Sequence, residues 1–165
     1  MKILYFVCAI LFAPISALAM NHGHSPSHPG MQSPFQTVEQ EGLVLEKFWA
    51  RARIGMAPNS AAYGRIRITD DEDRLVEART PVATTVELHE HIKDNGVMRM
   101  REVEGGFHLT SSTPLQMKPG GYHIMLLGLT GTLEANTTMP LELVFKSGRI
   151  LTIDVPVLDF KPMKH

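Results

Sequence analysis

The sequence contains one cysteine in 165 residues, Cys8, and this residue lies in an N-terminal apolar segment. That segment has the features of an export signal: Lys2 supplies a positive charge, Ile3 to Phe12 is apolar, and Ala17-Leu18-Ala19 is a cleavage signature. Removal of residues 1–19 would leave a chain without cysteine. The absence of cysteine from that mature chain excludes a disulfide, a thiolate nucleophile and the cysteine-ligated blue-copper site of electron-transfer proteins.

An excess of charge of either sign is also missing, since 16 Lys and Arg face 17 Asp and Glu. This balance argues against nucleic acid as a partner, because phosphate binding needs a basic surface. The apolar run of the signal is too short to span a bilayer, and no later run is long enough. We therefore predict a soluble periplasmic protein with no membrane span in the mature chain.

Long stretches with helical periodicity are absent as well. From about Gly42 onward the chain consists of short apolar runs separated by turn signals such as Asn95-Gly96 and Ser147-Gly148. This pattern predicts a single all-β domain, either a β-sandwich or a Greek-key barrel. The expected strands are 43–52, 61–69, 74–78, 85–92, 97–102, 121–127, 141–145 and 150–157.

The expected domain organisation has four parts. Residues 1–19 form the signal peptide, and residues 20–40 form a disordered tail rich in His, Met and Pro. Residues 41–159 form the folded domain, and residues 160–165 form a short C-terminal tail. Trp49, the only tryptophan, is predicted to anchor the core near the start of the barrel.

Histidine and methionine are frequent, with 8 and 10 copies. In the expected strand 85–92, alternation places His89 and His91 on one face, and the next strand places Met98 and Met100 on one face. A two-residue loop at Asn95-Gly96 would set His91 opposite Met100. A four-residue loop would instead set His89 opposite Met100 and His91 opposite Met98. Either register puts imidazoles and thioethers on the same side of the hairpin.

A third strand carries His123 and Met125, again two residues apart. If this strand lies near the hairpin, four neutral donors converge. Imidazole and thioether favour Cu(I), whereas hard cations prefer oxygen and zinc prefers Cys, His and carboxylate. The donor types therefore predict a copper site.

The spacing of these residues resembles that of the periplasmic copper chaperone family, PCuAC, which serves cytochrome c oxidase assembly. His89 and Met100 are separated by ten residues, and His123-Ile124-Met125 follows Met100 after twenty-two, one more than the usual twenty-one. Further similar stretches are 48–52, 58–63, 86–90, 96–101 and 119–126. The resemblance covers about Val44 to Val157.

This resemblance implies a cupredoxin-like β-barrel that binds Cu(I) through His89, Met100, His123 and Met125. It also implies delivery of copper to a copper site of cytochrome c oxidase, such as the copper A centre of subunit II. A thioredoxin-like copper protein of the Sco type is an expected second partner. The sequence departs from the family in having a histidine at position 91, and in carrying its His-rich tail mainly at the N-terminus.

Several other residues are auxiliary metal candidates. His91 is expected to support the site or act as an alternative ligand, and Met98 either packs beside the site or substitutes for a ligand. After cleavage at residue 19, His22 would be the third residue, and the amine, two amides and imidazole would form a square-planar nitrogen site for Cu(II). The alternative is a flexible linker with incidental histidines. The remaining auxiliary candidates are His24, His28 and His165.

Other function classes remain as alternatives to the chaperone. The same ligands would serve a periplasmic copper-sequestration or resistance protein without a dedicated client. A metal-free adhesion-like β-sandwich is a further possibility. An enzyme is not expected, because the sequence has no Ser-His-Asp arrangement, phosphate loop or open zinc motif.

Overall fold

The computed structural model describes residues 34–159, apart from 54, 56 and 71. Within these residues the chain forms strands and no long apolar helix of the kind that crosses a membrane. The strands are β1 (Thr37–Gln40), β2 (Leu43–Arg51), β3 (Asn59–Ile68), β4 (Glu72–Arg79), β5 (Ala83–Asp94), β6 (Val97–Glu102), β7 (Phe107–Thr110), β8 (Leu115–Met117), β9 (His123–Leu129), β10 (Thr138–Phe145) and β11 (Ile150–Leu158). The predicted all-β class is therefore confirmed.

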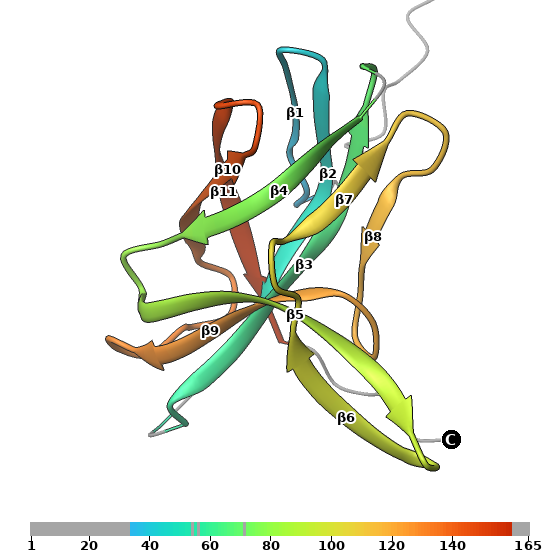
Figure 1. The fold of residues 1–165 in the computed structure, drawn as a ribbon. Coiled ribbons are helices and arrows are strands. Elements are labelled where there is room, and N and C mark those ends of the chain that lie inside the picture. Colours follow the sequence, from blue (N-terminus) through green and yellow to red (C-terminus); the bar gives the residue numbers. More distant parts are fainter. Residues whose placement is uncertain (1–33, 54, 56, 71, 160–165) are drawn as a thin grey trace, which may run out of the picture. The chain divides into compact units, whose positions relative to one another are not determined.

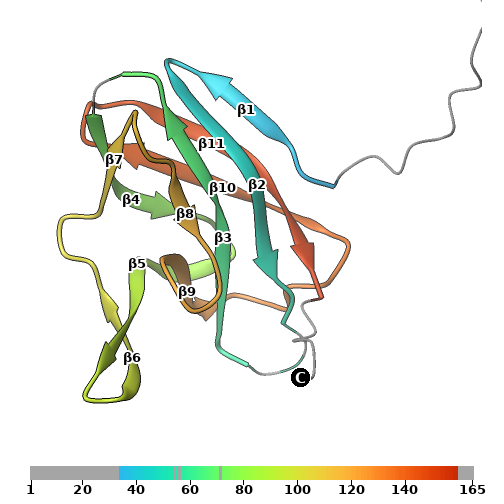
Figure 2. The ribbon, with the colours of Figure 1, turned by 90° about the vertical axis from the view of Figure 1, so that its right-hand side faces the viewer.

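The strands form one mixed sheet in the order β6-β5-β9-β3-β2-β11-β10-β4-β7, with β1 added to β2 and β8 added to β3. The pairing of β11 with β2 is parallel, and the other pairs are antiparallel. The sheet curves around an apolar core, and the β5–β6 hairpin projects from the body of the domain (Figures 1 and 2).

The predicted strands are present, and three short ones were not predicted. β1, β7 and β8 have four, four and three residues, too few to show a clear alternation. The predicted disordered tail, 20–40, needs correction at its end, because Thr37–Gln40 pairs with Leu43–Glu46 of β2. Residues 20–33 of that tail, the signal peptide and the C-terminal tail lie outside the described residues and stay predictions.

A β-bulge in β2 decides which side chains face the core. Leu43 and Leu45 are fully buried, and the alternation then shifts so that Phe48 and Ala50 are fully buried instead of residues 47 and 49. The shift occurs between Glu46 and Trp49, where Lys47 has a positive φ of 52°. A bulge inserts one residue and so re-aims the side chains that follow it. Trp49 and Arg51 therefore lie on the outer face of the sheet.

The bulge corrects the prediction for Trp49. Phe48 occupies the core position, and Gly64 on the neighbouring strand makes room for its ring. A Cβ at Gly64 would lie 2.6 Å from two ring atoms of Phe48. Trp49 instead stacks on Tyr63, with ring centroids 4.6 Å apart. Tyr63 is paired with Trp49 in the β2–β3 register and shares its face.

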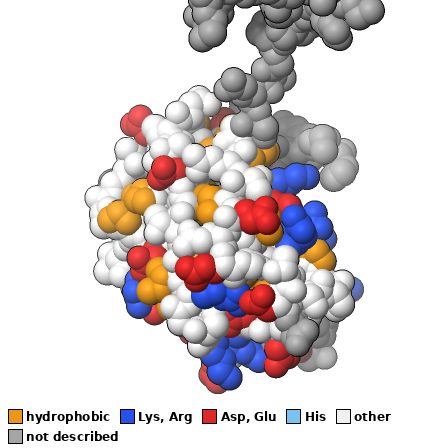
Figure 3. Space-filling model, turned by 90° about the horizontal axis from the view of Figure 1, so that it is seen from above, with side chains coloured by type: hydrophobic (Ala, Val, Ile, Leu, Met, Phe, Trp, Pro, Cys, Tyr) orange, Lys and Arg blue, Asp and Glu red, His pale blue; other side chains and the backbone are white. Residues whose placement is uncertain are grey.

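A network of charged groups joins two turns at the edges of β4 and β11. Asp73 is buried, with 3% of its side chain exposed, and its carboxylate accepts hydrogen bonds from Arg149 at 2.6 Å and from the Ser147 hydroxyl at 2.7 Å. Arg149 also pairs with Asp70 at 2.6 Å. Acidic and basic side chains are interspersed on the face of the domain seen from above (Figure 3).

Candidate metal centre

The hairpin between β5 and β6 has the two-residue loop, so one of the two predicted registers is confirmed. Asp94 pairs with Val97 across Asn95-Gly96, and both loop residues have positive φ, 49° and 85°. Asn-Gly favours this left-handed turn because glycine has no Cβ and asparagine tolerates the conformation. The register places His91 opposite Met100 and His89 opposite Glu102.

The third predicted strand lies beside the hairpin, as the convergence of donors requires. β9 pairs with β5, and His123 lies directly opposite His89. Met125 lies opposite Glu87 on one side and Ala61 of β3 on the other. Because paired residues point to the same side of a sheet, His89, His91, Met100, His123 and Met125 share one face.

The shortest contact between the candidate donors joins His123 to Met100. The Nε2 atom of His123 lies 3.1 Å from the Sδ atom of Met100. Its other ring nitrogen, Nδ1, donates to the carbonyl oxygen of Gly121 at 3.0 Å, which leaves Nε2 unprotonated and directed at the sulfur. With bond lengths like those of zinc, a metal held by both atoms would separate them by roughly 3.5 Å, so a small adjustment would admit it.

His123 is also kept neutral by its surroundings. It is 2% exposed, and burial lowers the pKa of its imidazole below the ordinary value, assisted by the neighbouring His91 and His89. The hydrogen bond to Gly121 opposes this effect but does not outweigh it. A neutral imidazole is the form that binds a metal, so His123 needs little proton release on binding.

His89 has one ring nitrogen engaged and one without a partner. Its Nε2 contacts a carboxylate oxygen of Glu87 at 2.7 Å, while Nδ1 is buried and has no hydrogen-bond partner. Metal-binding histidines commonly donate their second N–H to a carboxylate, which fixes the tautomer and the ring orientation. The ring centroids of His89 and His123 are 5.7 Å apart. The orphaned Nδ1 therefore fits a metal ligand.

A hollow of about 200 Å³ lies on this face. Four of the candidate donors line it: His91, Met100, His123 and Met125. His89 does not line it. The ring of His91 lies closer to His123 than that of His89, at 4.9 Å, so His91 remains an auxiliary candidate. Met98 is 56% exposed on the same face of β6 and pairs with Lys93. His22, His24, His28 and His165 lie outside the described residues.

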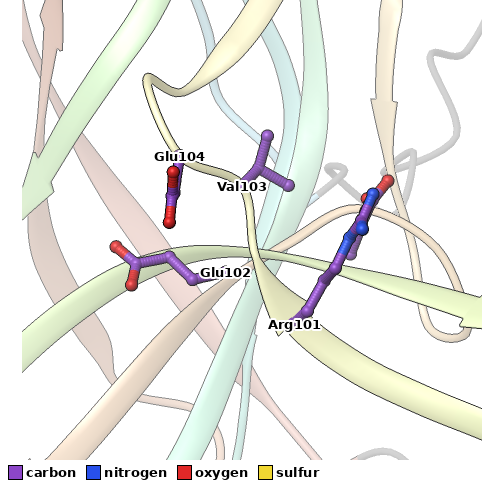
Figure 4. A pocket seen from close by; sticks show the side chains of 5 residues that line it. Arg101, Glu102, Val103 and Glu104 are labelled. Atoms are coloured by element: carbon purple, nitrogen blue, oxygen red, sulfur yellow. The ribbon is translucent and has the colours of Figure 1, made fainter.

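Two other observations bear on the metal. In the described part of the chain, no three His, Cys, Asp or Glu side chains are grouped as a metal site. A larger hollow, of about 640 Å³, is lined by Glu90, Arg101, Glu102, Val103 and Glu104 (Figure 4). It has no imidazole or thioether, and its Arg101 pairs with Glu90 at 2.7 Å. The soft donors thus lie in the smaller hollow.

Sequence reasoning missed four side chains of the site. Glu87 contacts His89, and Tyr63, Arg51 and Arg53 line the hollow beside the donors. Glu87 could have been found, because it precedes His89 by two residues and so shares its face. Arg51 could not, because the bulge that turns it outward leaves no clear sign in the sequence.

Residues 43–157 match the family described as "Putative lipoprotein LpqE-like". "Putative lipoprotein Lxx21020" of Leifsonia xyli is 33% identical over 156 residues, which cover 93% of this chain and 87% of that protein. Among solved structures, the copper-bound PCuAC domain from PmoF2 matches with a TM-score of 0.64 at 21% identity, over 76% of this chain and 99% of that one.

The Cu(I) form of DR1885 from Deinococcus radiodurans matches with a TM-score of 0.50 at 24% identity, over 75% of this chain and 81% of that one. At these identities the structural matches show a shared fold. Together with the family match, they confirm the cupredoxin-like fold and the resemblance that the His and Met spacing indicated.

Proposed function

This chain belongs to the LpqE-like family, and from the chemistry of its outer sheet face we propose that it is an exported copper chaperone. It binds Cu(I) through His89, Met100, His123 and Met125. The observation that carries the proposal is the 3.1 Å contact between His123 Nε2 and Met100 Sδ, two neutral soft donors with the buried, unpartnered Nδ1 of His89 on the same face.

Cu(I) suits this donor set better than Cu(II) or zinc. Thioether sulfur is soft and uncharged, and it favours Cu(I). The imidazole and thioether donors add no negative charge, so a metal with a single positive charge is the least demanding to accommodate. Met100 is 46% exposed at the rim, where a partner could take its place as a ligand. Such accessibility favours release to a client over permanent storage.

The proposed client is a copper site of cytochrome c oxidase, with a Sco-type thioredoxin-like copper protein as a second partner. The support is the similarity in fold to the PCuAC domain from PmoF2, together with the His and Met spacing of the sequence. The chain is not proposed to be an enzyme, since its candidate residues are metal donors on an open sheet face. Copper sequestration without a client is the second candidate, favoured by the extra donors His91 and Met98 near the site.

Export is proposed from the N-terminal signal and from two names, since the matched family and the relative from Leifsonia xyli are both described as putative lipoproteins. A lipid anchor is attached to a cysteine, and the only cysteine is Cys8, inside the apolar segment. Mass spectrometry of the protein from the native host tests both the cleavage site and the presence of a lipid anchor. An unmodified N-terminus at Met20 supports a free periplasmic protein and the amine site at His22, and a lipidated Cys8 would contradict both.

Copper binding is tested by titration of the full mature chain against a chromogenic Cu(I) chelator. We expect one Cu(I) at the folded site, and Met100→Leu should lower its affinity by at least about tenfold, since even outer-shell partners contribute that much. Met139→Leu is the matched control, because Met139 is 1% exposed in the core. Equal affinities for the two variants would contradict the proposed site.

Delivery is tested separately by mixing the Cu(I)-loaded chain with the apo copper domain of oxidase subunit II. Appearance of copper in the oxidase domain supports the chaperone. If the loaded chain retains its copper while a chelator of similar affinity removes it, sequestration is the better account.

A further inference from the structure

The hollow that holds the soft donors also holds two guanidinium groups. Arg51 at the end of β2 and Arg53 just beyond it line the same space as Met100 and His123. No Asp or Glu is among the described residues that line this hollow. The hollow thus combines neutral metal donors with two guanidinium groups.

The backbone holds both arginines firmly in place. The carbonyl oxygen of Arg51 accepts a hydrogen bond from the Ser60 hydroxyl at 2.6 Å. Arg53 exchanges two backbone hydrogen bonds with Leu133, at 2.7 and 3.0 Å. Their positions are therefore part of the fold and not an accident of a loose segment.

Arg53 has hydrogen-bonding capacity that the described chain does not use. Its Nε is buried without a hydrogen-bond partner, and it makes no ion pair with any described residue. A buried donor without a hydrogen-bond partner destabilises the fold, and the effect is larger when the donor is charged. Tyr63 completes this wall of the hollow. Its side chain lines the same hollow as Arg51 and Arg53, and burial raises the pKa of its phenol while the two positive charges act in the opposite direction.

A bound Cu(I) would add a third positive charge to this space. Charges of the same sign repel strongly where water is partly excluded, and neutral imidazole and thioether ligands cannot offset the repulsion. An anion between the guanidinium groups and the metal would satisfy Arg53 and neutralise part of the charge.

We propose that Arg51, Arg53 and Tyr63 form an anion subsite that binds one carboxylate or halide ion next to the metal. The metal half of this inference rests on the proposed function, whereas anion binding to the copper-free protein does not. The same chemistry has two sources, a small free anion or the carboxylate side chain of a docking partner.

The first test is a formate titration of the ¹⁵N-labelled, copper-free mature chain, followed by NMR at the Nε–H resonance of Arg53. Ionic strength is held constant with a bulky organosulfonate. The Arg53 Nε–H resonance should shift and reach a plateau as formate is added. In Arg53→Gln, formate binding is followed at backbone amide resonances, and its affinity should fall by about tenfold or more, the effect expected from losing a hydrogen bond to a charged group. Arg53→Lys keeps the charge and should retain part of the affinity.

The matched control is Arg99→Gln, which removes one positive charge from the exposed hairpin, where Arg99 pairs with Asp94 at 3.2 Å. Its formate affinity should equal that of the parent. A shift that does not saturate, or an Arg99→Gln effect as large as that of Arg53→Gln, would overturn the subsite. The amide spectrum of each variant shows whether the fold is retained, and Arg51→Gln gives a second route to the same result.

The second test compares the copper-free and Cu(I)-loaded chains. The added charge should tighten formate binding in the loaded chain, and by reciprocity formate should tighten copper binding by the same factor. Equal or weaker formate binding after loading would contradict the placement beside the metal. If the chain binds formate but no copper, the proposed function fails while the anion subsite stands.

Two short peptides identify the source of the anion: one contains Asp, and the other has Asn in place of each Asp. If the Asp peptide displaces formate and the Asn peptide does not, the subsite binds a partner's carboxylate. Displacement by chloride and not by the peptide assigns it to a small free anion.

Discussion

The Nε2 atom of His89 lies 2.7 Å from a carboxylate oxygen of Glu87, while the Nδ1 atom of the same ring is buried without a partner. The two residues are separated by one position on β5, so both side chains project from the outer face. The carboxylate orients the ring and leaves Nδ1 as the atom available to a metal.

Glu87→Ala should lower the Cu(I) affinity by about 10- to 100-fold, because the ring of His89 loses the group that fixes its orientation and tautomer. Glu87→Gln keeps an acceptor and should recover part of the loss. Chelator competition measures both. Glu90→Ala is the control, since Glu90 lies on the other face of β5 and pairs with Arg101. Parent-like affinity in Glu87→Ala would mean that Glu87 does not position a ligand.

His91 and His89 can be distinguished in the same assay. His91 lies opposite Met100 and lines the hollow. Its Nδ1 atom makes a long contact, 3.4 Å, with the carbonyl oxygen of Gly121. We expect His89→Ala to weaken Cu(I) binding more than His91→Ala, because only His89 combines a carboxylate partner with an orphaned nitrogen. The reverse order would transfer the ligand role to His91.

Gly64→Ala should destabilise the domain by about 1–3 kcal/mol, the usual cost of overpacking a core. The added methyl group would lie 2.6 Å from the Phe48 ring, which is fully buried and has no room to move. Gly131→Ala is the matched control, because no atom lies within 4 Å of the added group. Urea unfolding of both variants measures the difference, and similar losses would argue against the close packing of Phe48 on Gly64.

Asp73→Asn should destabilise the domain by about 3 kcal/mol at pH 7, the order expected when one member of a buried ion pair is lost. Burial alone would raise the pKa of the Asp73 carboxyl, but hydrogen bonds from Ser147, Arg74 and Arg149 outweigh it and hold the pKa below its ordinary value. The carboxylate therefore stabilises the fold above the unfolded pKa, and this stabilisation disappears as the pH falls through the lower folded value.

Urea unfolding at pH 7, 5 and 3 tests this dependence. The difference in the free energy of unfolding between the parent and Asp73→Asn should disappear only at the lowest pH. Asp154 lies at an exposed position of β11, and Asp154→Asn serves as the control, for which the difference from the parent should not shrink in this way. A difference between parent and Asp73→Asn that stays constant with pH would contradict the assignment.

The sequence was sufficient for the fold class and for the common face of the donors. Both follow from period-two alternation, which depends on the local chain alone. The register of the hairpin was narrowed to two options, and the left-handed conformation of Asn95-Gly96 selects between them. The match of His123 to His89 could not be derived from alternation, because it depends on which strand lies beside β5.

Two errors in placing side chains, at Trp49 and Arg51, come from one inserted residue in β2. The bulge at Lys47 reverses the alternation of β2, so Phe48 takes the core position expected for Trp49. The same reversal brings Arg51 to the metal hollow. No local rule marks a lysine as a residue with positive φ, since this conformation is rare outside glycine, asparagine and aspartate.

The most direct test of the proposed copper site is X-ray absorption at the copper edge of the Cu(I)-loaded mature chain, with His22, His24 and His28 replaced by Ala. Two imidazole nitrogens and two thioether sulfurs are expected, and one sulfur should disappear in Met100→Leu and another in Met125→Leu. A spectrum without a sulfur shell, or one that both substitutions leave unchanged, would contradict the assignment of Cu(I) to these four residues.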